Sequence, residues 1–326
     1  MLAVVPEATA EGPAPCLRDA PDPQPGPGEL AIAVRATALN QADLLQLRGH
    51  YPPPPGESEV PGLECSGVVE ALGEGAAGFA VGDRVMALLG GGGHATRVVA
   101  PAGQVLPLSD NLSFAEGAAL PEACLTAWTN LVVEGGLRAG ETVLVTGATG
   151  GMGTMVVQIA RELGGRVVAA GRSAERLQAL AAYGIETRVI LDGALVARVL
   201  VATADRGVDL VFDLVGGPFV PRLLEVLAVG GRLVLVGLAA GARSELDLRV
   251  PLHRRLRLIG SVLRPRSRPE KAALVAGFRD FGLPRLADGR LRPVVAEVLP
   301  FRRVAEAYRR LQAGGALGKI VLEVES

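Results

Sequence analysis

The chain has 326 residues and a formal net charge of −1, from 33 basic and 34 acidic side chains. This length suits about two domains, each with its own core. The near-neutral charge argues against a protein whose partner is a nucleic acid or a membrane surface. Hydrophobic residues make up 49% and aromatic residues 3%, so we expect cores of alanine, valine and leucine. The basic charge is almost all arginine, with Lys271 and Lys319 as the only lysines, which we attribute to genome composition.

The cysteines and the first residues bear on the cell compartment. Cys16, Cys65 and Cys124 are odd in number and far apart. This spacing suits neither a disulfide framework nor a zinc cluster, and it favours a cytoplasmic protein. Residues 1–20 lack the basic and apolar regions of a signal peptide. No apolar run approaches the roughly 18 residues that a membrane-spanning helix needs.

The first third of the chain predicts a β-rich domain. Residues 1–28 are rich in proline and glycine, and PDPQPGPGE over 21–29 predicts a turn-filled connection. Alternation over 29–39 predicts a strand. Asn40 then precedes a short amphipathic segment over 41–48. The usual role of an asparagine in this place is the N-cap of a helix. Short strands between glycines across 60–108 are typical of an antiparallel barrel.

Two loops in this part carry candidate functional residues. Four prolines directly follow Tyr51, so residues 49–56 predict a stiff loop that presents its side chain. Gly90–Gly93 is a run of four glycines, which suits a mobile lid or, equally well, a simple hairpin connection. We expect the next residue, His94, to be a surface histidine.

A helical region over 113–138 leads into the second domain. Ser113 and Glu116 have the spacing of a capping box, and Pro121 divides the region into two helices. The region ends where a nucleotide-binding pattern begins.

The stretch Glu141–Arg172 has the pattern of a dinucleotide-binding unit. A buried strand leads into the glycine-rich turn Gly147–Gly153, a helix follows, and a second strand spans 166–170. In such a βαβ unit the glycines let the backbone approach a pyrophosphate, and the helix N-terminus offers free N–H groups. Ala148 takes the place of the usual first glycine, but the strand–turn–helix context supports the motif.

Strands and helices continue to alternate after this unit. The pattern predicts strands over 187–191, 208–215, 231–236 and, at the sheet edge, 256–263, with a helix over 194–203. Alternation of this kind predicts a doubly wound parallel sheet, whose ligands bind beyond the carboxyl ends of the strands. Helices over 268–281 and 302–314 and a strand over 318–324 complete the chain.

The end of the second strand of the βαβ unit predicts the cofactor. NAD sites usually carry an acidic residue there, on the ribose 2′-hydroxyl. This chain instead has Gly171, Arg172 and Ser173, and no acid before Glu175. Arg172 suits a 2′-phosphate, and Arg176 lies one helical turn further on. We therefore expect NADP(H).

Several stretches together resemble the medium-chain dehydrogenase/reductase superfamily. They are ALNQADLLQLRGHYPPPPG, GLECSGVVEALG, VGDRVMALLGGGG, PEACLTAW, TGATGGMG and GKIVLEV. They look most like its zinc-free quinone oxidoreductase branch, and SVLRPRSR over 261–268 is similar to the tumour-suppressor-inducible NADPH quinone oxidoreductases. The resemblance covers the whole chain. It implies an α/β protein with a GroES-like antiparallel barrel from 1–122 and 268–326, and a Rossmann domain from 123–267.

The residues also address whether a catalytic zinc is present. Relatives that use zinc bind it through a cysteine, the histidine of a Gly-His-Glu, and a later cysteine. Here Asn40 stands near the first position and Leu63 replaces the histidine. A catalytic zinc needs three protein ligands, and without this Lewis acid nothing stabilises an alkoxide. We therefore predict no metal, and Cys65 as a small core residue.

The resemblance also implies which residues form the site. Asn40, Asp43 and Tyr51 would line the substrate cleft, with Tyr51 hydrogen-bonded to a quinone oxygen. The cofactor would be held by Thr126, Gly150, Gly151, Met152, Gly171, Arg172, Ser173, Arg176, Val215, Gly237, Leu238, Val262, Leu263 and Arg264. Leu191 replaces a tyrosine that often supports the 2′-phosphate in the family. Edge strands near 256–264 would pair two subunits into a homodimer.

The predicted function is NADPH-dependent reduction of quinones by hydride transfer without zinc. Catalysis would consist mainly of positioning the hydride donor and the acceptor. One alternative is an NADPH-dependent reductase of enone or alkenal double bonds, because both reactions place hydride on an activated carbon. Another is a protein that binds NADPH but serves a structural or RNA-binding role, which the lack of a basic, aromatic face disfavours.

Overall fold

The computed structural model describes residues 1–10 and 12–325. The chain forms two compact units, one from Met1–Leu125 with Leu263–Ser326 and the other from Thr126–Val262. The boundaries expected from the sequence were 122/123 and 267/268. In the structure Leu263 and Arg264 belong to the first unit and not to the nucleotide-binding domain. No helix among the described residues is both long and apolar enough to cross a membrane.

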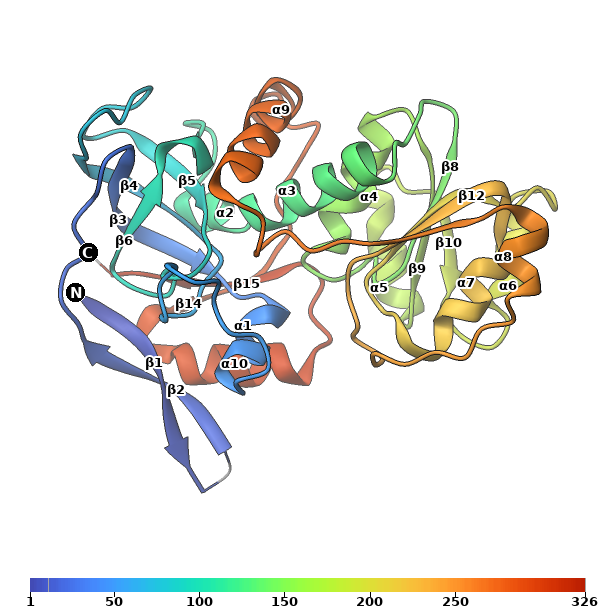
Figure 1. Cartoon of the computed structure of the whole chain (residues 1–326), viewed down its shortest axis with the longest axis horizontal. Coiled ribbons are helices and arrows are strands. Elements are labelled where there is room, and N and C mark those ends of the chain that lie inside the picture. The colour runs from blue at the N-terminus through green and yellow to red at the C-terminus, as the bar shows by residue number, and fades with distance from the viewer. Residues whose placement is uncertain (11, 326) are drawn as a thin grey trace. The chain divides into compact units, whose positions relative to one another are not determined.

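The first unit is built on a seven-stranded sheet of mainly antiparallel strands, in the order β14-β15-β3-β4-β5-β7 with β6 beside β3 (Figure 1). The strands are β3 (Glu29–Ala38), β4 (Glu64–Leu72), β5 (Arg84–Leu88), β6 (Arg97–Pro101), β7 (Val105–Pro107), β14 (Val295–Pro300) and β15 (Lys319–Glu323). Side chains of β3 alternate between buried and less buried positions, because successive residues of a strand face opposite sides. The predicted GroES-like barrel is confirmed.

A separate hairpin precedes this sheet. Strands β1 (Leu2–Thr9) and β2 (Gly12–Asp19) pair antiparallel, with Pro6 opposite Pro15 (Figure 1). This hairpin was not predicted from the sequence, whereas the predicted turn-filled connection is confirmed for residues 21–28, which are coil and turn up to the start of β3. Proline has no N–H to donate to a neighbouring strand, so it is tolerated mainly in edge strands. Both strands of a two-stranded hairpin are edge strands, which is why this hairpin accommodates its prolines.

Among the described residues the first unit has five α-helices, of which four begin at a capping residue or a proline. They are α1 (Gln41–Leu47), α2 (Phe114–Ala118), α3 (Pro121–Trp128), α9 (Arg268–Ala287) and α10 (Val304–Ala313), of which α3 crosses the junction between the units. Ser113 and Glu116 form the predicted capping box, since the Glu116 N–H donates to the Ser113 hydroxyl and the Ser113 N–H donates to Glu116. Pro121 opens α3, a favoured place for proline. Thr129–Glu134 continues α3 as a π-helical turn.

The second unit is a six-stranded parallel sheet in the order β10-β9-β8-β11-β12-β13. Its strands are β8 (Thr142–Val145), β9 (Arg166–Gly171), β10 (Thr187–Ile190), β11 (Val208–Asp213), β12 (Leu227–Leu235) and β13 (Arg257–Gly260). The helices are α4 (Gly153–Glu162), α5 (Ala174–Ala179), α6 (Leu195–Ala202), α7 (Val220–Glu225) and α8 (Arg249–Arg254). This is the Rossmann order, with the third strand in sequence at one edge and the sixth at the other. The predicted doubly wound sheet is confirmed.

The strand order fixes where a ligand of the second unit binds. The first strand, β8, lies between β9 and β11, so the order of the strands reverses between β8 and β11. In open parallel sheets a crevice forms at this point, outside the carboxyl ends of the strands. The loops that follow Val145 and Asp213 therefore flank the expected nucleotide site.

We predict that Gly67→Ala destabilises the first unit. A Cβ on Gly67 would lie 2.0 Å from the carbonyl oxygen of Ala33 on the neighbouring strand β3, so the two strands must separate. We expect a loss of about 1–3 kcal/mol in the free energy of unfolding, measured by urea denaturation. Gly193→Ala is the control, because its Cβ meets nothing within 4 Å. Equal stability of the two variants would contradict this account of the β3–β4 contact.

Candidate active site

The turn after β8 has the features of a pyrophosphate site. A Cβ on Gly153 would lie 2.2 Å from the carbonyl oxygen of Gly147, so only glycine lets α4 begin this close to the strand. The backbone N–H groups of Gly151 and Met152 have no hydrogen-bond partner among the described residues, and both residues are partly exposed, as is Gly150. Free N–H groups at a helix N-terminus suit a phosphate.

The end of β9 presents the basic side chains that the sequence predicted. Arg172 is exposed, and its guanidinium has no hydrogen-bond or ion-pair partner within the described part of the chain. Ser173 caps α5, where its hydroxyl accepts a hydrogen bond from the N–H of Arg176 at 3.3 Å, and it retains its own proton to donate. Leu191, in place of the family's tyrosine, is buried in the core.

A buried aspartate that the sequence did not single out shapes the loop after β11. Asp213 is fully buried and accepts hydrogen bonds from the Thr146 hydroxyl at 2.6 Å and from the N–H groups of Val215 and Gly216 at 2.9 and 3.0 Å. Burial raises its pKa, and these three donors oppose the rise. The carboxylate ties the ends of β8 and β11 together and fixes Val215, a predicted cofactor residue.

The other predicted cofactor residues differ in exposure. Gly237 is partly exposed, and Leu238 and Val262 are 52% and 53% exposed. Thr126 is 3% exposed, and its carbonyl oxygen accepts a hydrogen bond from the Asn130 amide at 2.8 Å. Leu263 is also buried, at 5% exposure.

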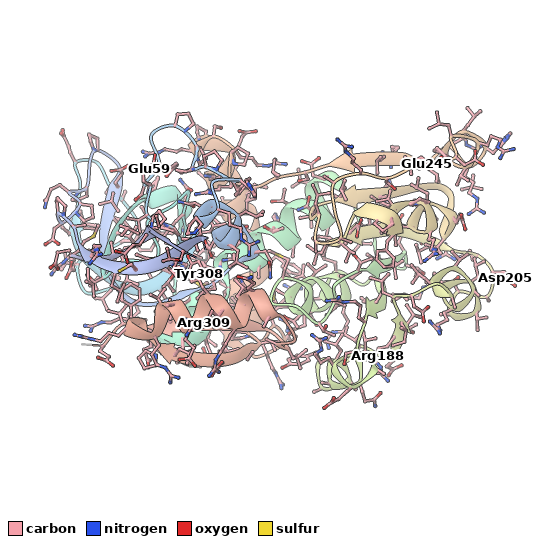
Figure 2. All side chains as sticks on the ribbon, turned by 90° about the horizontal axis from the view of Figure 1, so that it is seen from below. Glu59, Arg188, Asp205, Glu245, Tyr308 and Arg309 are labelled. Carbon is pink, nitrogen blue, oxygen red and sulfur yellow. The ribbon has the colours of Figure 1, made fainter. Side chains whose placement is uncertain are left out.

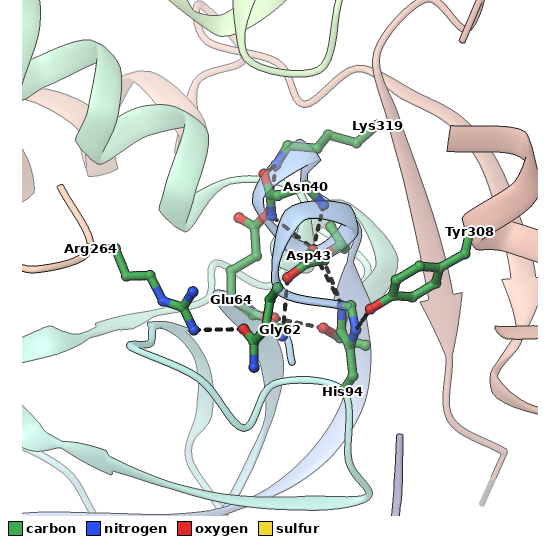
Figure 3. A network of polar contacts seen from close by, with 11 residues as sticks. Asn40, Asp43, Gly62, Glu64, His94, Arg264, Tyr308 and Lys319 are labelled. Carbon is green, nitrogen blue, oxygen red and sulfur yellow. Dashed lines mark hydrogen bonds and ion pairs between the residues drawn. The ribbon is translucent and has the colours of Figure 1, made fainter. Parts of the chain in front are cut away.

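In the first unit, a buried ammonium organises the predicted catalytic segment (Figure 3). Lys319 lies 2.5 Å from Glu64 Oε1 and also donates to Asn40 Oδ1. Lys319 and Glu64 are 4% and 0% exposed. The second carboxylate oxygen of Glu64 accepts the N–H of Glu122 at the start of α3, at 2.9 Å. The ion pair therefore joins β4, β15, α3 and the residue before α1.

The two partners of Asn40 fix the orientation of its amide. Lys319 can only donate, so it must face the amide oxygen, and the Glu64 carboxylate can only accept, so it takes the amide nitrogen, at 2.9 Å. Asn40 is also the N-cap residue of α1, its default role. Its side chain is thus committed to holding the site together, not left free for a substrate.

Asp43 also differs from its predicted role in lining the substrate cleft. The side chain is fully buried. One oxygen accepts the N–H of Asn40 at 2.6 Å and the other accepts the N–H of Gly62 at 3.1 Å. With both oxygens bonded to backbone, the carboxylate holds the start of α1 against the Gly62–Glu64 segment.

The prediction that His94 lies on the surface is wrong. His94 is fully buried, its Nε2 lies 3.8 Å from Asp43 Oδ2, and its Nδ1 lies 3.0 Å from the hydroxyl of Tyr308 (Figure 3). A Cβ on Gly62 would lie 2.3 Å from the His94 backbone nitrogen, so only glycine at position 62 lets the His94 backbone pack this close to it. Tyr308 is 2% exposed, whereas its neighbour on α10, Arg309, is exposed (Figure 2). Burial, and next the charge of Asp43, raise the pKa of Tyr308.

The four glycines before His94 form a packed segment and not a lid. Gly90–Gly93 are all buried. A Cβ on Gly90 would lie 2.3 Å from the Glu57 side chain, and one on Gly91 would lie 2.3 Å from the Ser58 carbonyl oxygen. Glycine is required here because two backbones approach closely, which the sequence alone did not distinguish from mobility.

Tyr51 is half-buried and keeps its hydroxyl available. The hydroxyl has no hydrogen-bond partner among the described residues. The guanidinium carbon of Arg264 lies 5.1 Å from the centre of the Tyr51 ring. Burial and the charge of Glu122 raise the pKa of Tyr51, while the charge of Arg264 lowers it.

Sequence reasoning missed Glu64, Lys319, Thr146 and Asp213 as organising residues. The sequence did contain one signal for Lys319, because only two of its 33 basic residues are lysines. In the structure both are buried, Lys271 at 1% and Lys319 at 4% exposure. In a chain that uses arginine on its surface, a retained lysine indicates a place that fits only a compact ammonium.

The donor set of this region does not suit a zinc ion. Among residues 1–10 and 12–325, no three histidine, cysteine or acidic side chains come together as a metal site. The residue near the expected first ligand position, Asn40, instead binds the ammonium of Lys319. A cation already held at this point repels a second one.

Two family models match this chain. The model described as alcohol dehydrogenase GroES-like domain matches residues 26–110, and the model described as zinc-binding dehydrogenase matches residues 151–276. The human synaptic vesicle membrane protein VAT-1 homolog-like is 31% identical over 320 residues, which cover 93% of this chain and 76% of that protein. A phenolphthiocerol/phthiocerol polyketide synthase chain of Mycobacterium tuberculosis is 32% identical over 92% of this chain, but the match covers 14% of its own length.

Solved structures agree with these matches. The quinone oxidoreductase of Thermus thermophilus, also solved in complex with NADPH, is 38% identical with a TM-score of 0.83 over 99% of this chain and 100% of its own. The enoyl reductase CurK is 25% identical with a TM-score of 0.84 over 99% and 98%. An NAD-dependent alcohol dehydrogenase is 32% identical with a TM-score of 0.85 over both full chains.

The two-unit fold and these matches define the class of protein. The chain belongs to the medium-chain dehydrogenase/reductase superfamily, whose members are NAD(P)-dependent oxidoreductases. Within it, the chain belongs to the zinc-free quinone oxidoreductase branch.

We predict that Lys319→Met strongly destabilises the protein, because it leaves the Glu64 carboxylate buried without a counter-ion. The expected loss is about 3–5 kcal/mol in the free energy of unfolding, measured with urea. Lys319→Met combined with Glu64→Met should recover most of this loss, since no buried charge is left unpaired. Arg290→Met, which breaks an exposed pair with Asp288, should cost under about 1 kcal/mol. A Lys319→Met protein as stable as the wild type would show that the ion pair carries no structural weight.

Proposed function

We propose that this protein reduces quinones with NADPH, by hydride transfer without zinc. The observation that carries the proposal is the hydroxyl of Tyr51, which has no hydrogen-bond partner among the described residues, whereas Asn40, Asp43 and Glu64 are all hydrogen-bonded within the chain. A quinone is already electrophilic, so it needs a hydride, a proton donor and little else. The likeness to the NADPH-bound Thermus thermophilus quinone oxidoreductase supports both the acceptor and the cofactor.

The cofactor preference follows from the end of β9. Arg172 presents an exposed guanidinium that no described residue binds, which suits the extra phosphate of NADP(H) through charge-assisted hydrogen bonds. An NAD site would need an acceptor for the ribose hydroxyls, and a carboxylate there would repel a 2′-phosphate. The N–H groups of Gly151 and Met152 would hold the pyrophosphate.

The chain's own residues have limited tasks in this reaction. Bound NADPH supplies the hydride. Tyr51 donates a hydrogen bond to the acceptor oxygen, where negative charge develops as the hydride arrives, and then its proton. The Lys319–Glu64–Asn40 network keeps the segment before α1 in place, so the acceptor meets a pre-formed surface.

Reduction of an enone or enoyl double bond is the second candidate. The enoyl reductase CurK and a polyketide synthase chain are among the proteins similar to this chain. The chemistry differs in one respect, because the carbon next to the carbonyl must also receive a proton. A protein that binds NADPH without turnover is the third candidate, and the VAT-1 homologues carry names that state no reaction.

We predict that Arg172→Ala weakens NADPH binding about tenfold and leaves NADH binding unchanged, because it removes charge-assisted hydrogen bonds to the 2′-phosphate alone. Fluorescence titration of each cofactor measures both constants. Arg166→Ala, at the opposite end of the same strand β9, is the matched control and should bind both as the wild type does. An unchanged affinity of Arg172→Ala for NADPH would remove the basis for the NADP(H) preference.

We predict that Tyr51→Phe lowers kcat about tenfold or more with a quinone acceptor, because the ring remains while the proton donor is lost. Steady-state oxidation of NADPH, followed by its absorbance, measures the effect. Tyr183→Phe, in the second unit, serves as the control and should turn over normally. Full activity in Tyr51→Phe would mean that water or another group protonates the product.

We also propose that two copies pair through β13. This strand lies at the edge of the parallel sheet, and exposed leucines gather on it and on the segment around α8, namely Leu248, Leu252 and Leu258 at 71%, 73% and 53% exposure. An exposed edge strand with apolar side chains is a natural pairing surface.

We predict a particle of twice 33.6 kDa by size-exclusion chromatography with light scattering. Leu258→Glu should shift it to the monomer mass, because it places charge on the edge strand. Val81→Glu, which changes an exposed valine of the first unit, should leave the mass unchanged. A wild-type monomer at micromolar concentration would contradict the proposed pairing.

A further inference from the structure

Arg264 is held in the first unit by neutral acceptors. It is 4% exposed, and its guanidinium donates to the carbonyl oxygens of Gly90 at 2.8 Å and Tyr51 at 3.1 Å and to Gln46 Oε1 at 2.7 Å. These acceptors come from the end of α1, the proline-rich loop and the glycine segment. One side chain therefore joins a helix end and two loops.

The charge of Arg264 is left without a counter-ion. No carboxylate forms an ion pair with it among the described residues, although Asp43, Glu57 and Glu122 act on it from further away. An unpaired cation in a partly desolvated place acts strongly on its nearest polarisable neighbour. That neighbour is the ring of Tyr51, 5.1 Å from the guanidinium carbon.

We propose that Arg264 is a positioning residue that acts through Tyr51, holding its loop and ring in place and stabilising the negative charge left when the hydroxyl gives up its proton. This assignment differs from the sequence-based expectation that Arg264 helps to hold the cofactor. It rests on the proposed function in one respect only, which is that Tyr51 is the proton donor.

The proton balance gives Arg264 its task. The acceptor gains a hydride, and with it two electrons, from NADPH, which is oxidised to NADP⁺. The reduced oxygen then takes a proton as the Tyr51 O–H bond breaks, and the tyrosinate is reprotonated by solvent. Burial disfavours that tyrosinate, and a guanidinium beside the ring offsets part of this cost.

Other charges near Tyr51 and Arg264 determine the direction in which the ionisation of Tyr51 moves when Arg264 is removed. Glu122 faces both Tyr51 and Arg264 and opposes ionisation of the phenol. Lys271 on α9 is 1% exposed and faces Glu57, Glu122 and Arg264, so it lessens the influence of these carboxylates. With Arg264 removed, the cation over the Tyr51 ring is lost while Lys271 still moderates Glu122, so the phenol should ionise at higher pH.

Ultraviolet titration of the phenols tests the pair without any turnover. The chain has three tyrosines, so the difference between the wild type and Tyr51→Phe isolates the ionisation of Tyr51. In an Arg264→Met background we expect that ionisation to move up by about one pH unit, and by less in Arg264→Lys, which keeps the charge. Arg84→Met is the matched control, because Arg84 lies 4.9 Å over the ring of Phe114 in the same unit, and it should not move the ionisation. An unmoved ionisation in Arg264→Met would overturn the proposal.

Kinetics separate this role from a cofactor contact. For Arg264→Met we expect kcat to fall about tenfold while the dissociation constant of NADPH stays within about twofold. A variant with weakened NADPH binding and normal kcat at saturation would make Arg264 a cofactor contact and overturn the proposal. If Tyr51→Phe is fully active while Arg264→Met still moves the ionisation, the pairing stands and the proton-donor role of Tyr51 fails instead.

A second variant covers the case in which Arg264→Met does not fold, judged by circular dichroism. Gln46→Met removes the Gln46 acceptor and keeps the cation. We expect it to lower kcat without changing NADPH affinity and to broaden or move the Tyr51 ionisation. A Gln46→Met protein identical to the wild type in all three would count against the positioning role.

Discussion

A buried ammonium joins segments of the first unit that are far apart in the sequence. Lys319 binds Glu64 and Asn40, and Glu64 in turn accepts an N–H at the start of α3. Desolvating two charges costs several kcal/mol, which their attraction recovers only if the remaining hydrogen-bonding capacity is also used. Here the second carboxylate oxygen and both ends of the Asn40 amide are used, so this arrangement is held in one geometry.

The same residues make this site of the chain unsuited to a zinc ion. In zinc-dependent relatives a metal would stand near Asn40 and Leu63, but in this chain the nearby cation is a side chain and its charge is balanced by Glu64. A balanced pair stabilises no alkoxide, so the site suits an acceptor that is already electrophilic. Tyr51 lies outside the network, which is why we propose it as the proton donor.

In the second unit, glycine packing and a buried carboxylate hold the loops in place instead of an ion pair. Glycines at the turn after β8 permit close backbone packing, and Asp213 ties the ends of β8 and β11. Both devices lie where the strand order reverses, which is where a dinucleotide binds in such sheets. Accurate loop placement on a rigid sheet is what a hydride transfer requires.

Much of the fold could be predicted because its signals are local, whereas the organising residues of the site depend on long sequence separations. The alternation of strands and helices gave the parallel sheet, but the β1–β2 hairpin was missed because proline content outweighs alternation in a local pattern. His94 was misjudged because its residue type predicts a surface, whereas here Asp43 and Tyr308 satisfy it inside. Glu64 and Lys319 are 255 positions apart, and the residues around each of them give no indication that the two side chains form an ion pair.

The most direct test of the account is the single-turnover oxidation of protein-bound NADPH, followed by absorbance after rapid mixing with a quinone or with an enone of similar size. We predict fast oxidation with the quinone, little with the enone, and weak binding of NADH in a parallel titration. Fast oxidation with the enone alone would move the protein to double-bond reduction. Absence of oxidation with either acceptor, despite tight NADPH binding, would contradict the proposal that this protein is an NADPH-dependent reductase.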